Sequence, residues 1–317
     1  MKKGLILILV LVFSVLLMPS CAKEEVAVAH EESEDVYEFV FIVKSMQFPF
    51  FLSMIEGAEA AAAALPNVNI RCIGPETPYS VEEQTQLVEQ AIIDGVDAIL
   101  IAPADSTAIV PAIERANRAG VLVATPNTKA YGGDVLTWVG VDNYQVGYDL
   151  GQTLASSINY AGNVLLIEGT PGNSTSEERV EGYRDAFLEY PDIVLLDSQP
   201  ADFNREKGMR LMENWLQRYD HIDAVGSINK DMTMGAVEAA KAVGRDKEFI
   251  HVTFDVDNDG LDALEAGEIL VTGAQNEKSQ AAISIYSTYL ALQGFKVPPE
   301  QYLPLSLVYK EDVPNYR

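Results

Sequence analysis

The chain has few of the residues that build metal centres, disulfide frameworks and nucleic-acid surfaces. Its 317 residues include two cysteines and three histidines, and 22 basic residues stand against 47 acidic ones. The formal net charge of -25 repels phosphate backbones and anionic lipid surfaces, so we expect neither nucleic-acid binding nor flat docking on a membrane. His30, His221 and His251 lack the spacing of metal ligands. We therefore expect no metal and no cofactor.

Common catalytic signatures are also missing. No Walker A, G-x-S-x-G, H-E-x-x-H or G-x-G-x-x-G segment occurs in the sequence. Residues 227–230, SINK, match the S-x-x-K pattern of serine acylases, but the companion S-D-N and K-T-G motifs are absent. We therefore expect no enzymatic activity.

The stretch HVTFDVDNDG, residues 251–260, matches the first half of a calcium-binding loop motif. Asp255, Asp257 and Asp259 follow the D-x-D-x-D-G opening of an EF-hand loop. An EF-hand needs a bidentate glutamate at position twelve, where this chain has Ala266, and its loop follows a helix rather than a strand-like run. We interpret Asp257 and Asp259 as helix-start residues whose charge complements the helix dipole.

The N-terminus has the pattern of an export signal. Two lysines precede an apolar run over residues 5–18, which is shorter than the roughly 20 apolar residues of a bilayer-spanning helix. The segment MPSC resembles a bacterial lipobox, which implies removal of residues 1–20 and lipidation of Cys21; an uncleaved N-terminal anchor is the alternative. Residues 21–36 are polar and acidic, which is typical of a flexible tether.

Lipidation of Cys21 would leave Cys72 without a partner for an intramolecular disulfide. Cys72 lies in the strand-like run NVNIRCI, where a buried apolar role is the simplest interpretation. The exported chain must then be stabilised by a hydrophobic core. Its 317 residues, of which 48% are hydrophobic, suffice for two modest domains or one large one.

From residue 37 onward, short apolar runs alternate with amphipathic helical segments. The helical segment SVEEQTQLVEQAIIDG begins with Ser80 and Glu83 at the spacing of a capping box and ends at Gly95. The rhythm breaks at residues 136–147 and restarts at Asn163, which indicates two doubly wound α/β lobes. Nine runs have the near-continuous hydrophobicity of buried parallel strands: EFVFIV, NVNIRCI, DAILIA, GVLVAT, NVLLIE, DIVLLD, IDAVGS, FIHVTF and EILVTG.

Polar side chains follow five of these runs, where open α/β sheets form their ligand crevice. Each has an ordinary alternative as a loop cap or turn former, and a lysine there can simply be exposed. Carboxylates accept hydrogen bonds from hydroxyls, amides donate and accept, and lysine donates, a combination that suits a neutral polyhydroxy ligand. The five residues are Lys44, Asn127, Asn229, Asp255 and Gln275.

Three phenylalanines complete the candidate site. Phe50, Phe51 and Phe203 could act as apolar platforms for the C–H face of a sugar ring. Phe51 also fits a helix-core position, since it shares a helical face with Met54 and Ile55.

Several segments carry a resemblance to a known family. VKSMQFPFFLSMIEGAEAAA resembles its first strand, Asn-Pro-Phe-Phe turn and first helix, and ERVEGYRDAF its Arg-x-Glu-Gly-Phe segment. SQPADFNREKG, NKDMTMGA, VTFDVDNDG and TGAQNEKSQAA resemble further family segments. Together they identify a resemblance, from about residue 37 to 310, to bacterial periplasmic sugar-binding proteins of the ribose-binding type, the periplasmic binding protein-like I group.

The resemblance implies two Rossmann-like lobes joined by a three-crossing hinge. It places residues 37–143 with 276–304 in the N-terminal lobe and residues 144–275 with 305–317 in the C-terminal lobe. It also implies hydrogen bonds from four residues to the ligand, and ring stacking by the three phenylalanines. The four are Arg179, Asn229, Asp255 and Gln275.

The chain departs from the family pattern mainly in the first lobe. The family's asparagine before Pro-Phe-Phe is Phe48 here, and its small polar residue after the first strand is Lys44. Pro126 and Asn127 replace its Asp-Arg pair, which argues against ribose as the ligand. Lys44 resembles the lysine of related receptors for rhamnose and for a furanose-type quorum signal, and we take it as a ligand donor.

These features together predict a monomeric, lipid-anchored receptor on the outer side of the membrane. It would bind a small carbohydrate, either a monosaccharide or a polyol, between its lobes and deliver it to an ABC permease. The alternative is a signal receptor for a furanose-type quorum signal or a chemotactic sugar. Transcription regulators of the LacI type share the fold, but they carry a helix-turn-helix where this chain has its export signal.

Overall fold

The computed structural model describes residues 36–317 of the chain. The predicted export signal, Cys21 and all of the tether except its last residue lie outside the described residues. Within residues 36–317, no helix combines the length and the hydrophobicity that a bilayer crossing requires.

The first sheet has six strands, which are, in spatial order, β11 (Glu300–Tyr302), β5 (Thr137–Gly140), β4 (Leu122–Pro126), β3 (Ala98–Ile101), β1 (Tyr37–Ile42) and β2 (Val68–Ile73). All neighbouring strands pair in parallel. Four helices cover it: α1 (Pro49–Ala63), α2 (Val81–Ile93), α3 (Val110–Arg118) and α9 (Glu277–Leu292).

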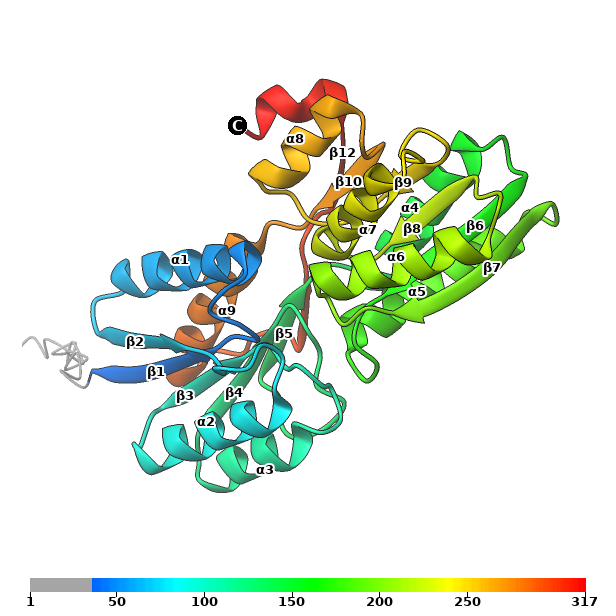
Figure 1. Cartoon of the computed structure of the whole chain (residues 1–317). Helices are drawn as coiled ribbons and strands as arrows, with labels where there is room; N and C mark the ends of the chain where they lie inside the picture. The colour runs from blue at the N-terminus through cyan, green and yellow to red at the C-terminus, as the bar shows by residue number, and fades with distance from the viewer. Residues whose placement is uncertain (1–35) are drawn as a thin grey trace, which may run out of the picture. The chain divides into compact units, whose positions relative to one another are not determined.

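Alternation along β1 shows how the two faces of this sheet are buried. Phe39 and Phe41 belong to the core under α1 and α9, whereas Val40 and Ile42 belong to the core under α2 and α3 (Figure 1). Successive side chains of a strand point to opposite faces, so a continuous apolar run is stable here only because helices cover both faces.

The second sheet also has six strands, in the order β12 (Ser306–Tyr309), β10 (Val271–Ala274), β9 (Ile250–Val252), β8 (Ala224–Ser227), β6 (Gly162–Glu168) and β7 (Ile193–Pro200). Only the edge strand β12 is antiparallel to its neighbour. The remaining helices are α4 (Asn143–Ser157), α5 (Ser174–Leu188), α6 (Arg205–Arg218), α7 (Lys230–Ala242), α8 (Asn258–Ala266) and the 3-10 helix η1 (Lys310–Asn315).

These helices associate in pairs around the second sheet. Helix α4 packs on α5 and α6 packs on α7, while α8 packs on η1 beside the β12 end of the sheet (Figure 1). The two sheets with their helices are the two doubly wound lobes that the alternating pattern predicts. The chain passes between them three times: from β5 to α4, from β10 to α9, and from β11 to β12.

All nine apolar runs form strands, as predicted, but the described residues contain twelve strands in total. The three additional strands, β5, β11 and β12, have only three or four residues each. Strand β11 is largely polar, because it pairs at the outer edge of the first sheet. The short edge strands β11 and β12 leave little apolar signal in the sequence. Strand β5 is buried between β11 and β4, but it lies within residues 136–147, which were interpreted as the break in the pattern.

Two local expectations need correction. Ser80 does cap α2, since its hydroxyl accepts the Glu83 N–H at 3.2 Å, but the Glu83 carboxylate accepts the N–H groups of Glu76 and Thr77 instead of completing the capping box. Cys72 is half-buried rather than buried, because β2 is an edge strand.

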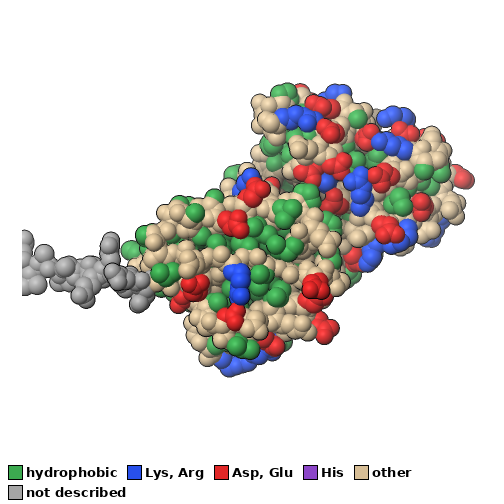
Figure 2. All heavy atoms as spheres, turned by 60° about the vertical axis from the view of Figure 1, so that its left-hand side comes forward, with side chains coloured by type: hydrophobic (Ala, Val, Ile, Leu, Met, Phe, Trp, Pro, Cys, Tyr) green, Lys and Arg blue, Asp and Glu red, His purple; other side chains and the backbone are tan. Residues whose placement is uncertain are grey.

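Charged side chains of both signs are interspersed over the face of the molecule shown in Figure 2. Many charged side chains among residues 36–317 form ion pairs, such as Arg205 with Glu238 at 2.6 Å. Exposed pairs of this kind contribute little to stability, about 0–1 kcal/mol each, so the buried hydrophobic cores of the two lobes hold the fold together.

Candidate functional site

A cavity lies where the carboxyl ends of strands from both sheets meet. Its wall contains all nine residues predicted from the sequence: Lys44, Phe50, Phe51, Asn127, Arg179, Phe203, Asn229, Asp255 and Gln275. It also contains four that the sequence reasoning did not select: Phe48, Tyr79, Thr175 and Asp231. The parallel strands explain the convergence, since their carboxyl ends lie at one edge of each sheet.

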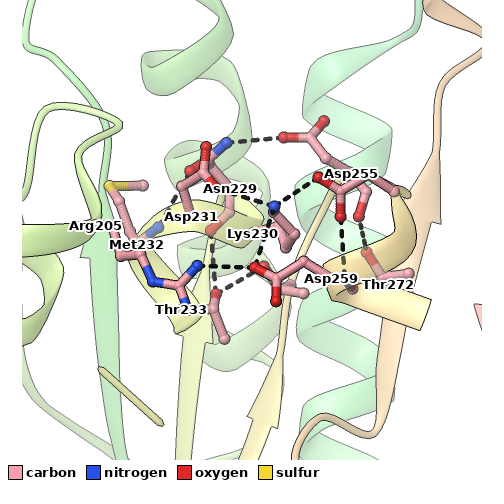
Figure 3. Close-up of polar contacts among 12 residues, drawn as sticks. Arg205, Asn229, Lys230, Asp231, Met232, Thr233, Asp255, Asp259 and Thr272 are labelled. Atoms are coloured by element: carbon pink, nitrogen blue, oxygen red, sulfur yellow. Dashed lines mark hydrogen bonds and ion pairs between the residues drawn. The ribbon is translucent and has the colours of Figure 1, made fainter. Parts of the chain in front are cut away.

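Asp255 is the main acceptor in the second lobe. The Asn229 amide donates to one of its carboxylate oxygens at 2.8 Å (Figure 3). The Gln275 amide donates to the other at 2.5 Å. Burial raises the pKa of Asp255 to about 6, against the opposing effects of the nearby Arg179 and of these two hydrogen bonds. Asp255 is therefore mostly ionised at neutral pH and holds two amides in fixed orientations.

Arg179 supplies a fixed set of donors from helix α5 and is only 2% exposed. Its guanidinium donates to Asn143 Oδ1 at 2.9 Å and to the Ile228 carbonyl at 2.8 Å, and its central carbon lies 3.8 Å from the ring centroid of Phe254. Burial lowers the pKa of Arg179 to about 10, which leaves the side chain charged at neutral pH.

A glycine makes the position of Arg179 possible. A Cβ atom built at Gly147 of α4 would lie 2.0 Å from the carbonyl oxygen of Arg179, so the two helices can approach this closely only with glycine there. The crossing of α4 and α5 therefore sets how far the guanidinium reaches toward the cavity.

Lys44 is buried, at 2% exposed, so the alternative of a surface lysine is wrong. Its ammonium donates to Thr128 Oγ1 at 2.5 Å and to Asn127 Oδ1 at 3.2 Å. Burial, and then the charge of Arg179, lower its pKa to about 7, against the attraction of Asp255. Lys44 is thus a donor whose charge changes near neutral pH.

Contacts between the lobes border the cavity. Asn127, at the end of β4, donates to Gln275 Oε1 at 3.4 Å, and the hydroxyls of Thr128 and Thr175 are 3.1 Å apart. The side chain of Asn173, which caps α5, donates to the Ala104 carbonyl of the first lobe at 3.0 Å. Polar groups of both lobes thus enclose one site.

Tyr79 joins the aromatic side chains of the two lobes. Its ring stacks on Phe203 with centroids 5.4 Å apart and planes 9° apart. Phe50 and Phe51 contact edge-to-face at 5.1 Å, and Phe51 is both a helix-core residue and part of the cavity wall, so its two interpretations are compatible. Tyr79 follows Pro78 in the loop between β2 and α2, six residues beyond the end of β2, so the strand-end pattern does not select it.

Backbone strain is concentrated at this cavity. Four residues in its wall, Tyr79, Asn127, Phe203 and Asp255, have positive φ angles of 64°, 69°, 54° and 92°. Such angles are costly for residues other than glycine, and they persist where the surrounding structure holds them, commonly at functional sites. The strain is independent support for a functional role of the cavity.

The second and third aspartates of the calcium-like stretch have other partners. Asp257 caps helix α8 and lies 2.6 Å from Lys230 Nζ, and Asp259 in the first turn of α8 pairs with Arg205 at 2.8 Å (Figure 3). Both are helix-start residues, as the dipole argument predicts. Within residues 36–317, no group of three or more His, Cys, Asp or Glu side chains is arranged to hold a metal ion.

Comparisons with known proteins agree with the geometry. The family described as "Periplasmic binding protein domain" matches residues 39–296. The ribose import binding protein RbsB of Bacillus subtilis (strain 168) is 33% identical over 310 residues, which cover 97% of this chain and 99% of the relative.

Two solved structures are similar over nearly the whole described chain. An ABC transporter periplasmic solute binding protein from Actinobacillus succinogenes 130z with bound D-allose has a TM-score of 0.82 and 30% identity, and the match covers 88% of this chain and 100% of that one. An ABC transporter solute binding protein from Bacillus halodurans C-125 with bound myo-inositol has a TM-score of 0.84 and 29% identity, over 90% and 98% of the two chains.

Proposed function

Because the chain belongs to the periplasmic binding protein family, we propose that it binds a small carbohydrate in the cavity between its lobes and delivers it to an ABC permease. The observation that carries this proposal is the convergence of Arg179, Asn229, Asp255 and Gln275 with aromatic rings at the carboxyl ends of strands from both sheets. Fixed donors and acceptors beside apolar surfaces match the hydroxyls and C–H faces of a sugar or polyol.

Selectivity follows from the fixed polar groups. A hydrogen bond to a charged group contributes about 1.5–3 kcal/mol, and a buried polar group left without a partner costs about 1–3 kcal/mol. Hydrogen bonds from Asn229 and Gln275 fix the orientation of the Asp255 carboxylate. Its remaining lone pairs can therefore accept ligand hydroxyls only from certain directions. An epimer that places a hydroxyl elsewhere loses one of these bonds and leaves its partner unsatisfied.

Relatives support the ligand class. The similar proteins bind ribose, D-allose or myo-inositol according to their descriptions, and these ligands share a compact, neutral, polyhydroxy character. Pro126 and Asn127 stand here where the family's charged Asp-Arg pair would face the ligand, so we propose a ligand other than ribose. Residues of both lobes contact the cavity, which suits closure of the lobes around the bound molecule.

We further propose the cellular setting and the lobe boundaries. The receptor is a monomer that is exported, lipid-anchored through Cys21 and free of turnover activity. Its N-terminal lobe comprises residues 37–143 and 276–304, and its C-terminal lobe comprises residues 144–275 and 305–317. The three passages of the chain between the sheets support these boundaries.

A thermal-shift screen tests the proposed function. The mature chain is heated with a panel of pentoses, hexoses, deoxy-sugars and polyols, and a ligand is expected to raise the melting temperature, because binding to the folded state alone stabilises it. Calorimetry then measures affinity, and NMR after prolonged incubation checks that the ligand is unchanged. If no panel member binds, carbohydrate binding is refuted; if deletion of the gene leaves uptake of the ligand intact, the transport role is refuted.

A further inference from the structure

The two lobes contribute unequally to the wall of the cavity. From the second lobe come one aromatic side chain, Phe203, and six polar ones. The first lobe supplies four aromatic side chains, Phe48, Phe50, Phe51 and Tyr79, and its polar groups are Lys44, Asn127 and the phenol hydroxyl of Tyr79. The cavity therefore has a polar half and an aromatic half.

The aromatic half is a corner rather than a single platform. Around Tyr79, the Phe203 ring lies parallel at 5.4 Å, the Phe48 ring is tilted by 51° at 6.0 Å, and the Phe51 ring is tilted by 71° at 6.2 Å. A flat platform suits the C–H face of a sugar ring, whereas rings at several angles enclose a compact apolar group. We call Phe48, Phe51, Tyr79 and Phe203 the aromatic corner.

Tyr79 is held firmly in this corner. Its backbone N–H donates to the Lys44 carbonyl at 2.9 Å, and its side chain packs against the hydrophobic cores of both lobes. Its positive φ of 64° is strained for an aromatic residue. Burial raises the pKa of the Tyr79 phenol well above its usual range, so it stays uncharged.

The polar groups next to the corner are already engaged. Lys44 donates to Asn127 and Thr128, and its Nζ lies 5.7 Å from the ring centroid of Phe51 and 5.9 Å from that of Phe203. Its remaining proton can serve an oxygen at the edge of the corner. A hydroxyl placed against the carbon faces of these rings, away from the phenol hydroxyl of Tyr79, would lose its water without gaining an equivalent partner, whereas a methyl group there gains favourable burial.

We infer that the ligand is a deoxy-sugar, a monosaccharide in which a methyl group replaces a hydroxymethyl group. The methyl group occupies the aromatic corner, and the ring hydroxyls meet Arg179, Asn229, Asp255 and Gln275 in the polar half. This inference rests on the proposed function and narrows it from carbohydrates in general to those with one apolar end.

Three matched sugar pairs test the inference by calorimetry: 6-deoxy-D-allose with D-allose, L-rhamnose with L-mannose, and L-fucose with L-galactose. Each pair differs only by one hydroxyl group. We expect at least one deoxy-sugar to bind with a Kd about tenfold or more below that of its hydroxylated partner, because burial of a hydroxyl without a partner costs about that much.

The variant Phe48→Asn tests the role of the aromatic corner in ligand preference and should preserve the fold. Phe48 occupies the N-cap position of α1 with extended backbone and no capping side chain, and asparagine is among the best N-cap residues. The variant brings an amide into the corner, so the preference for the deoxy-sugar should fall to about twofold or less, or reverse. Tyr79→Ser should act likewise, and Tyr160→Ser, at an exposed tyrosine with a similar φ of 61°, is its control.

Two results would overturn the inference. In one, the hydroxylated sugar binds as well as its deoxy partner in all three pairs; in the other, none of the three deoxy-sugars binds. Neither result refutes the proposed function, which the wider panel of sugars and polyols tests separately. If both Phe48→Asn and Tyr79→Ser keep the wild-type preference for the deoxy-sugar, the aromatic corner does not cause that preference.

Discussion

The Asn229 amide donates to the Asp255 carboxylate at 2.8 Å and thereby ties the end of β8 to the end of β9. Asn229 also caps helix α7, because its side-chain oxygen accepts the Met232 N–H at 3.2 Å. One side chain thus orients the acceptor of the site and begins the helix beside it. The geometry of the cavity is therefore coupled to the secondary structure around it.

Asp255→Ala should abolish carbohydrate binding and leave the fold intact. The variant removes a charged acceptor and leaves the amides of Asn229 and Gln275 without their partner. We expect affinity for the best panel sugar to fall by about 100-fold or more, which corresponds to about 3 kcal/mol. Calorimetry measures the affinity and circular dichroism the fold. Asp259→Asn, outside the cavity wall, is the control, and unchanged affinity of the Asp255 variant would refute the site.

His251 should make the second lobe sensitive to acid. It is 2% exposed, packs on Phe249 with centroids 5.2 Å apart, and neither of its ring nitrogens has a hydrogen-bond partner within residues 36–317. Burial lowers its pKa in the folded chain to about 4, below the value of about 6.5 in the unfolded chain. The unfolded state therefore binds the proton first, and stability is lost as the pH falls from about 6.5 toward 4.

Urea unfolding at several pH values measures this effect. Between pH 7 and pH 4.5, His251 should account for a loss of about 2–3 kcal/mol in the free energy of unfolding. Carboxylates also titrate in this range, so the comparison is with His251→Leu, which should lose less stability over the same interval. If the free energy of unfolding falls equally with pH in the wild type and in His251→Leu, His251 does not cause the loss of stability in acid.

Gly147→Ala should weaken carbohydrate binding because it displaces the Arg179 side chain. The new Cβ would lie 2.0 Å from the Arg179 carbonyl oxygen, so α4 and α5 must separate and the guanidinium must move. Overpacking of this kind costs about 1–3 kcal/mol of stability, and we expect affinity to fall by about tenfold or more. Gly260→Ala is the control, since its nearest contact would be an ordinary 3.4 Å. Wild-type affinity in the Gly147 variant would contradict the close-packing argument.

Lys230→Met should destabilise the second lobe. The ammonium, on a side chain only 5% exposed, lies 2.9 Å from Asp231 (Figure 3) and 2.6 Å from Asp257. Removing it leaves two adjacent carboxylates without their cation, and loss of one partner of a buried pair costs about 3–5 kcal/mol. Urea unfolding measures the loss. The control is Lys207→Met, which removes an exposed ion pair with Asp202 and should cost less than about 1 kcal/mol of stability. Equal losses of stability in the two variants would contradict the difference between the buried and the exposed pair.

Much of the site was predictable because it depends on local sequence signals. Asn127, Asn229, Asp255 and Gln275 each follow an apolar run, and parallel strands bring such positions to one edge of a sheet. Arg179 could be named only through the resemblance to a family, since it lies on a helix with no strand-end signal.

Other residues of the wall depend on contacts between distant segments. Tyr79 belongs to the cavity because its ring meets Phe203, 124 positions further along the chain and in the other lobe. No local pattern encodes that contact. The short edge strands β11 and β12 were missed for a related reason, since pairing with a neighbour rather than hydrophobicity defines them.

Hydrophobic periodicity and chain order are local properties, so the alternation of strands and helices, the two-lobed α/β class and the strand-end positions of the polar residues follow from the sequence. The burial of Lys44, the ion pairs of Asp257 and Asp259, and the place of Tyr79 in the aromatic corner depend instead on the folded arrangement. Burial, ion pairing and ring contacts depend on which distant segments meet, and that is settled when the two lobes pack.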